Sequence, residues 1–212
     1  MRIASYVSLY VLSLGIALYA IGAYALVPLG ALLHPDMRAS FQAHAISVYT
    51  HIFASAIALA IGPLQFSSRL RASKPRMHRW FGRVYLGLGV LFGGLAGLYM
   101  ALHAFGGYAS RVGFACLALA WLFTGLRAFL AIRRGDVVSH RRWMVRNFAL
   151  TFAAVTLRLY LPISMGLGIA FEVAYPVIAW LCWVPNILIA ELFFNRAQTP
   201  APQRSALPTK AS

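Results

Sequence analysis

Residues 84–103 read VYLGLGVLFGGLAGLYMALH and contain no charged side chain. As an α-helix rising 1.5 Å per residue, a segment of this length spans about 30 Å, the thickness of the hydrocarbon layer of a bilayer. The rest of the chain has a similar character, since 61% of its 212 residues are hydrophobic, 11% are charged and the mean hydropathy is +0.73. Soluble domains are roughly 45–50% apolar, so the composition excludes a soluble fold.

Five further apolar runs lie on either side of this segment, and together they predict an all-α, polytopic membrane protein with six transmembrane helices. The first run is too long for a signal peptide and has no clear small-residue cleavage site, so we expect it to be retained as a span. Spans two to five should form a four-helix core, in which the glycines of span three allow close packing. The expected spans lie near residues 5–33, 45–66, 84–103, 112–132, 147–168 and 173–194 of a transmembrane domain over residues 1–194. Residues 195–212, rich in Ala, Pro, Gln, Ser and Thr, are expected to form a disordered cytoplasmic tail.

The distribution of cations predicts the orientation of the chain. Residues 67–83 carry six Lys and Arg residues, residues 133–146 carry five, Arg2 adds one and the segment after Asn195 adds three. With six spans, all of these lie on one side, and only Arg38 and Arg111 lie on the other. By the positive-inside rule, both termini are cytoplasmic and the chain is a multi-pass protein of the bacterial cytoplasmic (inner) membrane.

The net charge of +15 would suggest nucleic acid as a partner if the protein were soluble. Here the cations lie in short connections between apolar runs, where they would contact anionic lipid headgroups. We therefore expect membrane lipids, and no nucleic acid, as partners. The two cysteines, Cys116 and Cys182, lie within apolar runs and indicate neither a disulfide framework nor a thiolate metal cluster.

The six histidines fall into two layers, which gives one hypothesis about chemistry. A b-type haem between transmembrane helices needs two neutral imidazoles at similar depth on facing helices. His78 and His140 occupy equivalent positions where spans three and five begin, and they are one possible pair of iron ligands. In the outer layer, His51 could face His103 or join His44 on its own helix. Interface anchoring without any metal is the alternative for each of these histidines.

Arginines give the competing hypothesis. Two His-Arg pairs, together with a further arginine after each of them, could form a site for a lipid phosphate or a phosphorylated substrate. The arginines of this set are Arg79, Arg83, Arg141 and Arg146. Arg158 lies deep within span five, where an ionisable group is costly and usually faces a cavity or a partner. Its candidate partners are Glu172, a haem propionate or an anionic substrate, while Arg127 and Glu191 could pair with each other or reach the interface separately.

The residues that carry a family resemblance lie between 44 and 195. They are His51, Gly62-Pro63-Leu64-Gln65-Phe66, Pro75, His78-Arg79, Gly82-Arg83-Val84-Tyr85, His140-Arg141-Arg142-Trp143-Met144, Arg146 and Ala153-Ala154-Val155-Thr156-Leu157-Arg158. With these motifs, the chain resembles the bacterial family of predicted membrane proteins known as domain of unknown function 2306 (DUF2306). This resemblance implies membership of the family and no particular activity.

A second resemblance is to the ascorbate-linked di-haem transmembrane cytochromes, through His78-Arg79-Trp80-Phe81-Gly82 at the start of span three. That family pairs histidines of spans two and four and of spans three and five. His51, His78 and His140 match three of these positions, but residues 112–132 contain no histidine, so a second haem would lack its partner unless His103 replaces it. The resemblance implies at most one haem b.

Two functions therefore remain open from the sequence. The first is a transmembrane electron carrier with haem b between His78 and His140, arginines on its propionates and a membrane redox partner or a second copy of the chain. The second is a non-redox transporter or accessory subunit that binds an anionic lipid or small anion through the His-Arg pairs and Arg158. The sequence shows no Ser-His-Asp signature, carboxylate pair or zinc motif, so hydrolytic catalysis has little support.

Overall fold

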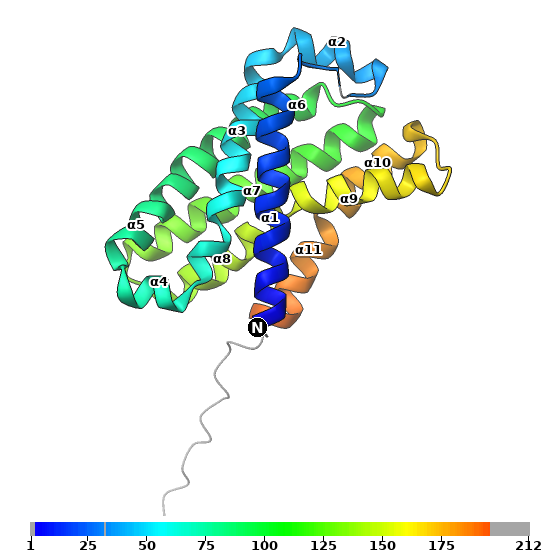
Figure 1. Ribbon diagram of the computed structural model, residues 1–212. Helices are drawn as coiled ribbons and strands as arrows, with labels where there is room; N and C mark the ends of the chain where they lie inside the picture. Colours follow the sequence, from blue (N-terminus) through cyan, green and yellow to red (C-terminus); the bar gives the residue numbers. More distant parts are fainter. Residues whose placement is uncertain (1–2, 32, 196–212) are drawn as a thin grey trace, which may run out of the picture.

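The computed structural model describes residues 3–31 and 33–195, and it confirms the all-α, six-span architecture (Figure 1). Within this part of the chain, six helices are long and apolar enough to cross a membrane. They cover Tyr6–Leu26, Ala45–Phe66, Pro75–Leu102, Gly107–Arg133, Val137–Gly166 and Phe171–Asn195. The disordered tail predicted from residue 195 lies outside the described residues apart from Asn195, which ends the last helix.

Several spans are built from more than one helical segment. Span one is α1 (Ile3–Leu26) and span four is α7 (Gly107–Arg133), each continuous. The segments of the other spans are α3 (Ala45–Ile61) with η1 (Pro63–Phe66), α5 (Pro75–Arg83) with η2 (Val84–Phe92) and α6 (Gly93–Leu102), α8 (Val137–Thr151) with α9 (Ala153–Gly166), and α10 (Phe171–Leu181) with α11 (Val184–Ile189) and η3 (Ala190–Asn195). Two short helices connect spans at the membrane surface, α2 (Pro35–Ala43) and α4 (Ser68–Ser73).

The helix boundaries differ from the predicted spans where the chain turns. Span one ends at Leu26, seven residues before the predicted end, because Pro28 has no N–H for a helical bond and Gly30 adopts a positive φ of 93°. Span five begins at Val137, ten residues before its predicted start, because Asp136 caps the helix by accepting a hydrogen bond from the Ser139 N–H at 2.9 Å. Hydrogen bonds from Ser139 also lower the pKa of Asp136.

The four-helix core predicted for spans two to five is present. Its buried centre contains Ala58 of α3, Tyr85 and Val90 of η2, Trp121 and Ala128 of α7, and Met144, Phe148 and Leu150 of α8. Outside this core, α1 packs against α3, and α10 packs against α7 and α9. The hairpin of α9 and α10 leans away from α1 at one end of the molecule (Figure 1). Residues of all three helices line a cavity there.

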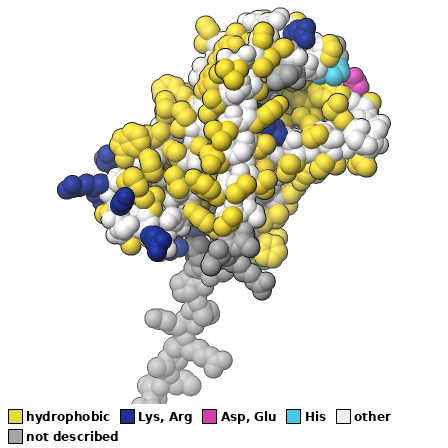
Figure 2. Space-filling model, viewed as in Figure 1, with side chains coloured by type: hydrophobic (Ala, Val, Ile, Leu, Met, Phe, Trp, Pro, Cys, Tyr) yellow, Lys and Arg dark blue, Asp and Glu magenta, His cyan; other side chains and the backbone are white. Residues whose placement is uncertain are grey.

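Most exposed cations gather at one end of the molecule, over α4 and α5 (Figure 2). We call this the basic end, and we call the other, which holds α2 and the turns at residues 103–106 and 167–170, the opposite end. The surface between the two ends is largely hydrophobic, with exposed side chains such as Val11, Leu95 and Phe123. A lipid-facing surface of this kind agrees with a multi-pass membrane protein.

Candidate functional site

A cavity of about 610 Å³ lies in the half of the membrane domain nearer the opposite end. Its walls come from α1, α2, α3, α6, α7, α9 and α10, from the end of α8, and from the connection between α1 and α2. In Figure 2 it is visible as a hollow between α1 and the hairpin of α9 and α10, with a basic side chain inside an otherwise hydrophobic surface. The cavity contains two of the residues that the sequence singled out, His51 and Arg158.

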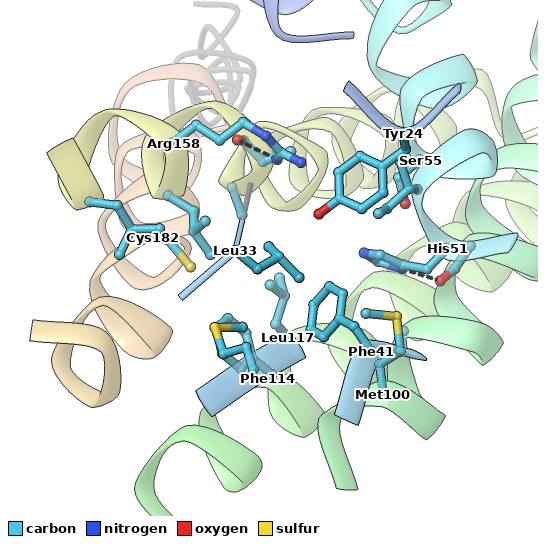
Figure 3. A pocket seen from close by; sticks show the side chains of 18 of the residues that line it. Tyr24, Leu33, Phe41, His51, Ser55, Met100, Phe114, Leu117, Arg158 and Cys182 are labelled. Carbon is cyan, nitrogen blue, oxygen red and sulfur yellow. Dashed lines mark hydrogen bonds between the residues drawn. The ribbon is translucent and has the colours of Figure 1, made fainter. Parts of the chain in front are cut away.

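His51 is fixed on one wall by the glycines of the neighbouring helix. Its Nδ1 lies 2.8 Å from the Gly93 carbonyl oxygen, and its other ring nitrogen points into the cavity (Figure 3). A Cβ atom at Gly97 would lie 2.7 Å from this Nδ1, so the ring occupies space that only a glycine leaves free. Ser55, one helical turn further along α3, also faces the cavity, and its buried hydroxyl has no hydrogen-bond partner within the described chain.

Arg158 projects from α9 on the other side of the cavity, toward Tyr24 of α1 (Figure 3). It donates from Nη1 to the Ala154 carbonyl oxygen at 3.1 Å, which uses one of its five N–H groups. Arg158 lies eight residues from the end of its helix and His51 lies six residues from the start of α3, roughly 12 and 9 Å along the helix axes. The two side chains therefore lie at similar depth.

Glu172, one of the three candidate partners of Arg158, does not form an ion pair with it. Glu172 begins α10 at the opposite end, where its Oε1 lies 3.9 Å from His34 Nε2 and more than half of its side chain is exposed. Among the side chains that the structure describes, no carboxylate forms an ion pair with Arg158. The guanidinium group therefore reaches into the cavity with its charge unmatched by the described protein.

His103 lies outside this cavity and contacts His44 instead of His51. The two rings are tilted by 32° with their centroids 4.0 Å apart, and Tyr99 packs against both. Each Nδ1 is bonded to a backbone carbonyl of its own helix or turn, His44 to Ser40 and His103 to Tyr99. These rings lie at the opposite end, near the interface, and the structure gives no contact between them and His51.

His78 and His140 lie near the basic end on two helices that run in the same direction. Tyr85 is seven residues after His78 and Asn147 is seven residues after His140, two helical turns in each case. The Tyr85 hydroxyl donates to Asn147 Oδ1 at 2.8 Å, so the corresponding faces of the two helices are turned toward each other. His140 Nδ1 is bonded to the Ala128 carbonyl oxygen at 2.9 Å, whereas the buried His78 Nδ1 has no partner within the described residues.

The four arginines of the proposed anion site are in different situations. Arg79, Arg83 and Arg141 are exposed at the basic end. Arg146 forms a two-pronged ion pair with Glu191 through its Nε and Nη2, and its guanidinium lies 4.3 Å from the ring centroid of Trp143. Glu191 therefore pairs with Arg146 and not with Arg127, which lies over the same Trp143 ring at 4.9 Å.

Sequence reasoning missed a buried hydrogen-bond network in the centre of the four-helix core. Asn147 is fully buried, and its amide donates to the Trp121 carbonyl at 2.7 Å and to Thr124 Oγ1 at 2.9 Å. Thr151 accepts from the Trp121 indole at 2.8 Å and lies 2.7 Å from the Tyr85 hydroxyl. The spacing of Asn147 and Thr151 by four residues in an otherwise apolar helix was a signal that could have indicated it.

Within the described residues, no group of three or more His, Cys, Asp or Glu side chains could hold a metal ion. In a comparison with known families, residues 48–194 match the family model described as predicted membrane protein (DUF2306). The match covers more than half of the chain. The chain belongs to the DUF2306 family. His51, Arg158 and the Tyr85 network all lie within the matched DUF2306 region, whereas Tyr24 and the rest of α1 precede it. Searches of curated proteins and of solved structures found no match.

Proposed function

We propose that this DUF2306 protein binds an amphipathic acid from the membrane in the cavity between His51 and Arg158. The observation that carries the proposal is the Arg158 guanidinium, which enters a largely hydrophobic cavity without a carboxylate partner in the described chain. A charged group within the hydrocarbon layer is costly unless it meets an opposite charge and hydrogen-bond acceptors. The acidic head of a ligand would supply both.

The walls of the cavity suit the rest of such a ligand. Apart from the polar groups described above, they consist of apolar and aromatic side chains, including Leu33, Phe41, Met100, Phe114 and Leu117 (Figure 3). A volume of about 610 Å³ is in the range of about 300–1,000 Å³ that small-molecule sites occupy. The hollow opens on a hydrophobic face of the molecule, so a ligand could enter it directly from the lipid.

Binding can be measured through Trp121, which lines the cavity. A brominated fatty acid should quench its fluorescence, and subtraction of the signal from a Trp121→Phe variant removes the contribution of the other four tryptophans. Arg158→Met should raise the dissociation constant at least about tenfold, which corresponds to about 1.4 kcal/mol, the scale of one charge-assisted hydrogen bond. Arg127→Met removes an arginine outside the cavity and should leave the dissociation constant unchanged. Equal dissociation constants for the unaltered protein, Arg158→Met and Arg127→Met would refute the proposal.

The orientation of the chain is the second part of the proposal. We place the basic end in the cytoplasm and the cavity in the outer half of the inner membrane, on the strength of the cation distribution and the positive-inside rule. Fusion of reporters to the turn at Gly135 and to the turn at Gly168 tests it. A cytoplasmic reporter should be active only at the first, and the reverse pattern would contradict the orientation.

One observation supports a second candidate function, electron transfer through haem b. Because Tyr85 and Asn147 contact each other directly, His78 and His140 lie on mutually facing sides of their helices, as two axial ligands require. This site is separate from the cavity, and such a carrier would need a membrane redox partner. The optical spectrum of protein purified from haem-replete cells tests the candidate.

A further inference from the structure

The hydrogen bond of His51 determines what its free nitrogen can do. A carbonyl oxygen can only accept, so Nδ1, 2.8 Å from the Gly93 oxygen, carries the ring's proton. In the neutral imidazole, Nε2 is then an acceptor with a lone pair, and this is the nitrogen that points into the cavity (Figure 3). Gly97 leaves the space in which the ring lies, because a Cβ atom there would be 2.7 Å from His51 Nδ1, and the Gly93 carbonyl oxygen holds the ring in this orientation.

The groups around His51 favour the neutral ring when the cavity holds no ligand. Arg158, from α9, already places one positive charge in the same apolar space, and a second cation beside it would have no compensating anion in the described chain. The wall residues from α6 and α7 are not ionisable. The other ionisable groups that line the cavity are Tyr19 and Tyr24 of α1, His34 before α2, and Tyr175 and Cys182 of the α10 segment.

The cavity thus presents donors on one side and an acceptor on the other. A bare carboxylate would satisfy Arg158, but its lone pairs would face the lone pair of His51 Nε2. We infer that the cavity binds its acid together with one proton, held between an oxygen of the acid and Nε2 of His51, while the other oxygen accepts from Arg158. This inference rests on the proposed function and specifies the ligand class as lipophilic carboxylic acids that bind together with one proton.

The proton balance of this step is simple. In water near neutral pH the acid is ionised, since an ordinary carboxyl group has a pKa of about 4.3. Binding takes one proton from the buffer, whose acid form loses one bond to hydrogen, and forms one new bond, either O–H on the ligand or N–H at Nε2. The two forms contain the same number of protons, so the uptake of one proton per ligand is expected from both.

Isothermal titration of the full-length protein in detergent with octanoate measures this number directly. Titrations at about pH 7.5 in two buffers of different ionisation enthalpy should give an uptake of about one proton per bound octanoate, and the dissociation constant should rise about tenfold per pH unit above that pH. His51→Phe keeps a ring of similar shape against Gly93 and Gly97 but has no acceptor. It should bind with an uptake near zero and a dissociation constant that does not depend on pH.

The matched control is His34→Phe, which removes the other histidine of the cavity and should retain the full proton uptake. Binding by the unaltered protein without proton uptake would overturn the inference and leave the proposed function intact. Undiminished uptake by His51→Phe would also overturn it. Failure of the unaltered protein to bind octanoate would instead remove the proposed function itself. Since the proton count of the unaltered protein is decisive on its own, the test does not depend on how well the variants fold.

Discussion

Replacement of Gly97 by alanine is the sharpest test of how the cavity is built. The added Cβ would lie 2.7 Å from His51 Nδ1 and 2.9 Å from its Cε1, whereas ordinary contacts begin at 3.4 Å. The ring must therefore withdraw by about 0.7 Å, which would stretch the 2.8 Å hydrogen bond to Gly93 to its limit of about 3.5 Å. Overpacking of this kind costs about 1–3 kcal/mol, and the lost hydrogen bond adds roughly 0.6 kcal/mol in a membrane protein.

Gly87→Ala is the matched comparison, because it lies in the same span and a Cβ there meets no atom within 4 Å. We expect Gly97→Ala to weaken octanoate binding and to lower its proton uptake below one, while Gly87→Ala leaves both unchanged and gains up to about 1 kcal/mol of helix stability. Titration calorimetry measures both the dissociation constant and the proton uptake. Gly97→Ala protein with unaltered binding and proton uptake would refute the view that Gly97 positions His51.

Three further predictions concern other parts of the molecule. Asn147→Ala removes three buried interhelical hydrogen bonds, so at roughly 0.6 kcal/mol each it should lower the free energy of unfolding in mixed micelles by about 2 kcal/mol. Tyr108→Phe, at a side chain that is 83% exposed, should have no effect, and equal stability of both variants would contradict the role of the network. Double-mutant cycles between Asn147→Ala and Tyr85→Phe should show a coupling of roughly 0.6 kcal/mol, and strict additivity would argue against their direct bond. If the second candidate function is right, purified protein will show a Soret band that is lost in His78→Ala and in His140→Ala, and a colourless, folded preparation would eliminate it.

The architecture could be predicted from the sequence because each part of it depends on local properties. Apolar runs of sufficient length must be helices in lipid, where every backbone group needs an internal hydrogen bond. The cation asymmetry is likewise a property of the connections alone. The predicted helix boundaries were less accurate where a helix extends beyond the hydrocarbon layer, as at Val137. Asp136 caps this helix, so its first, polar and basic residues are helical although they lie outside the apolar run.

The residues of the site were only partly predictable, for a different physical reason. Arg158 and His51 could be recognised because ionisable groups are rare and costly within spans. Their partners depend on how helices pack against each other, which no local pattern contains. Glu172 begins α10 beyond the turn at Gly168 and contacts His34, and His103 meets His44 because both lie at the interface. The contact between Gly97 and His51 joins residues 46 positions apart in the chain, so it requires the relative register of α3 and α6.

Arg158→Lys separates the charge of Arg158 from its geometry. The guanidinium donates one N–H to Ala154 and still presents a planar set of donors to the cavity, so it can hold its own helix and a ligand at the same time. A lysine ammonium is a single strongly hydrated point charge on a flexible stem. In this apolar space, contact with the Ala154 carbonyl oxygen would compete with contact to the ligand. We expect the lysine variant to bind octanoate more tightly than Arg158→Met and more weakly than the unaltered protein. Affinity equal to that of the unaltered protein would mean that charge alone holds the ligand, and that the directed donors of Arg158 have no part in recognition.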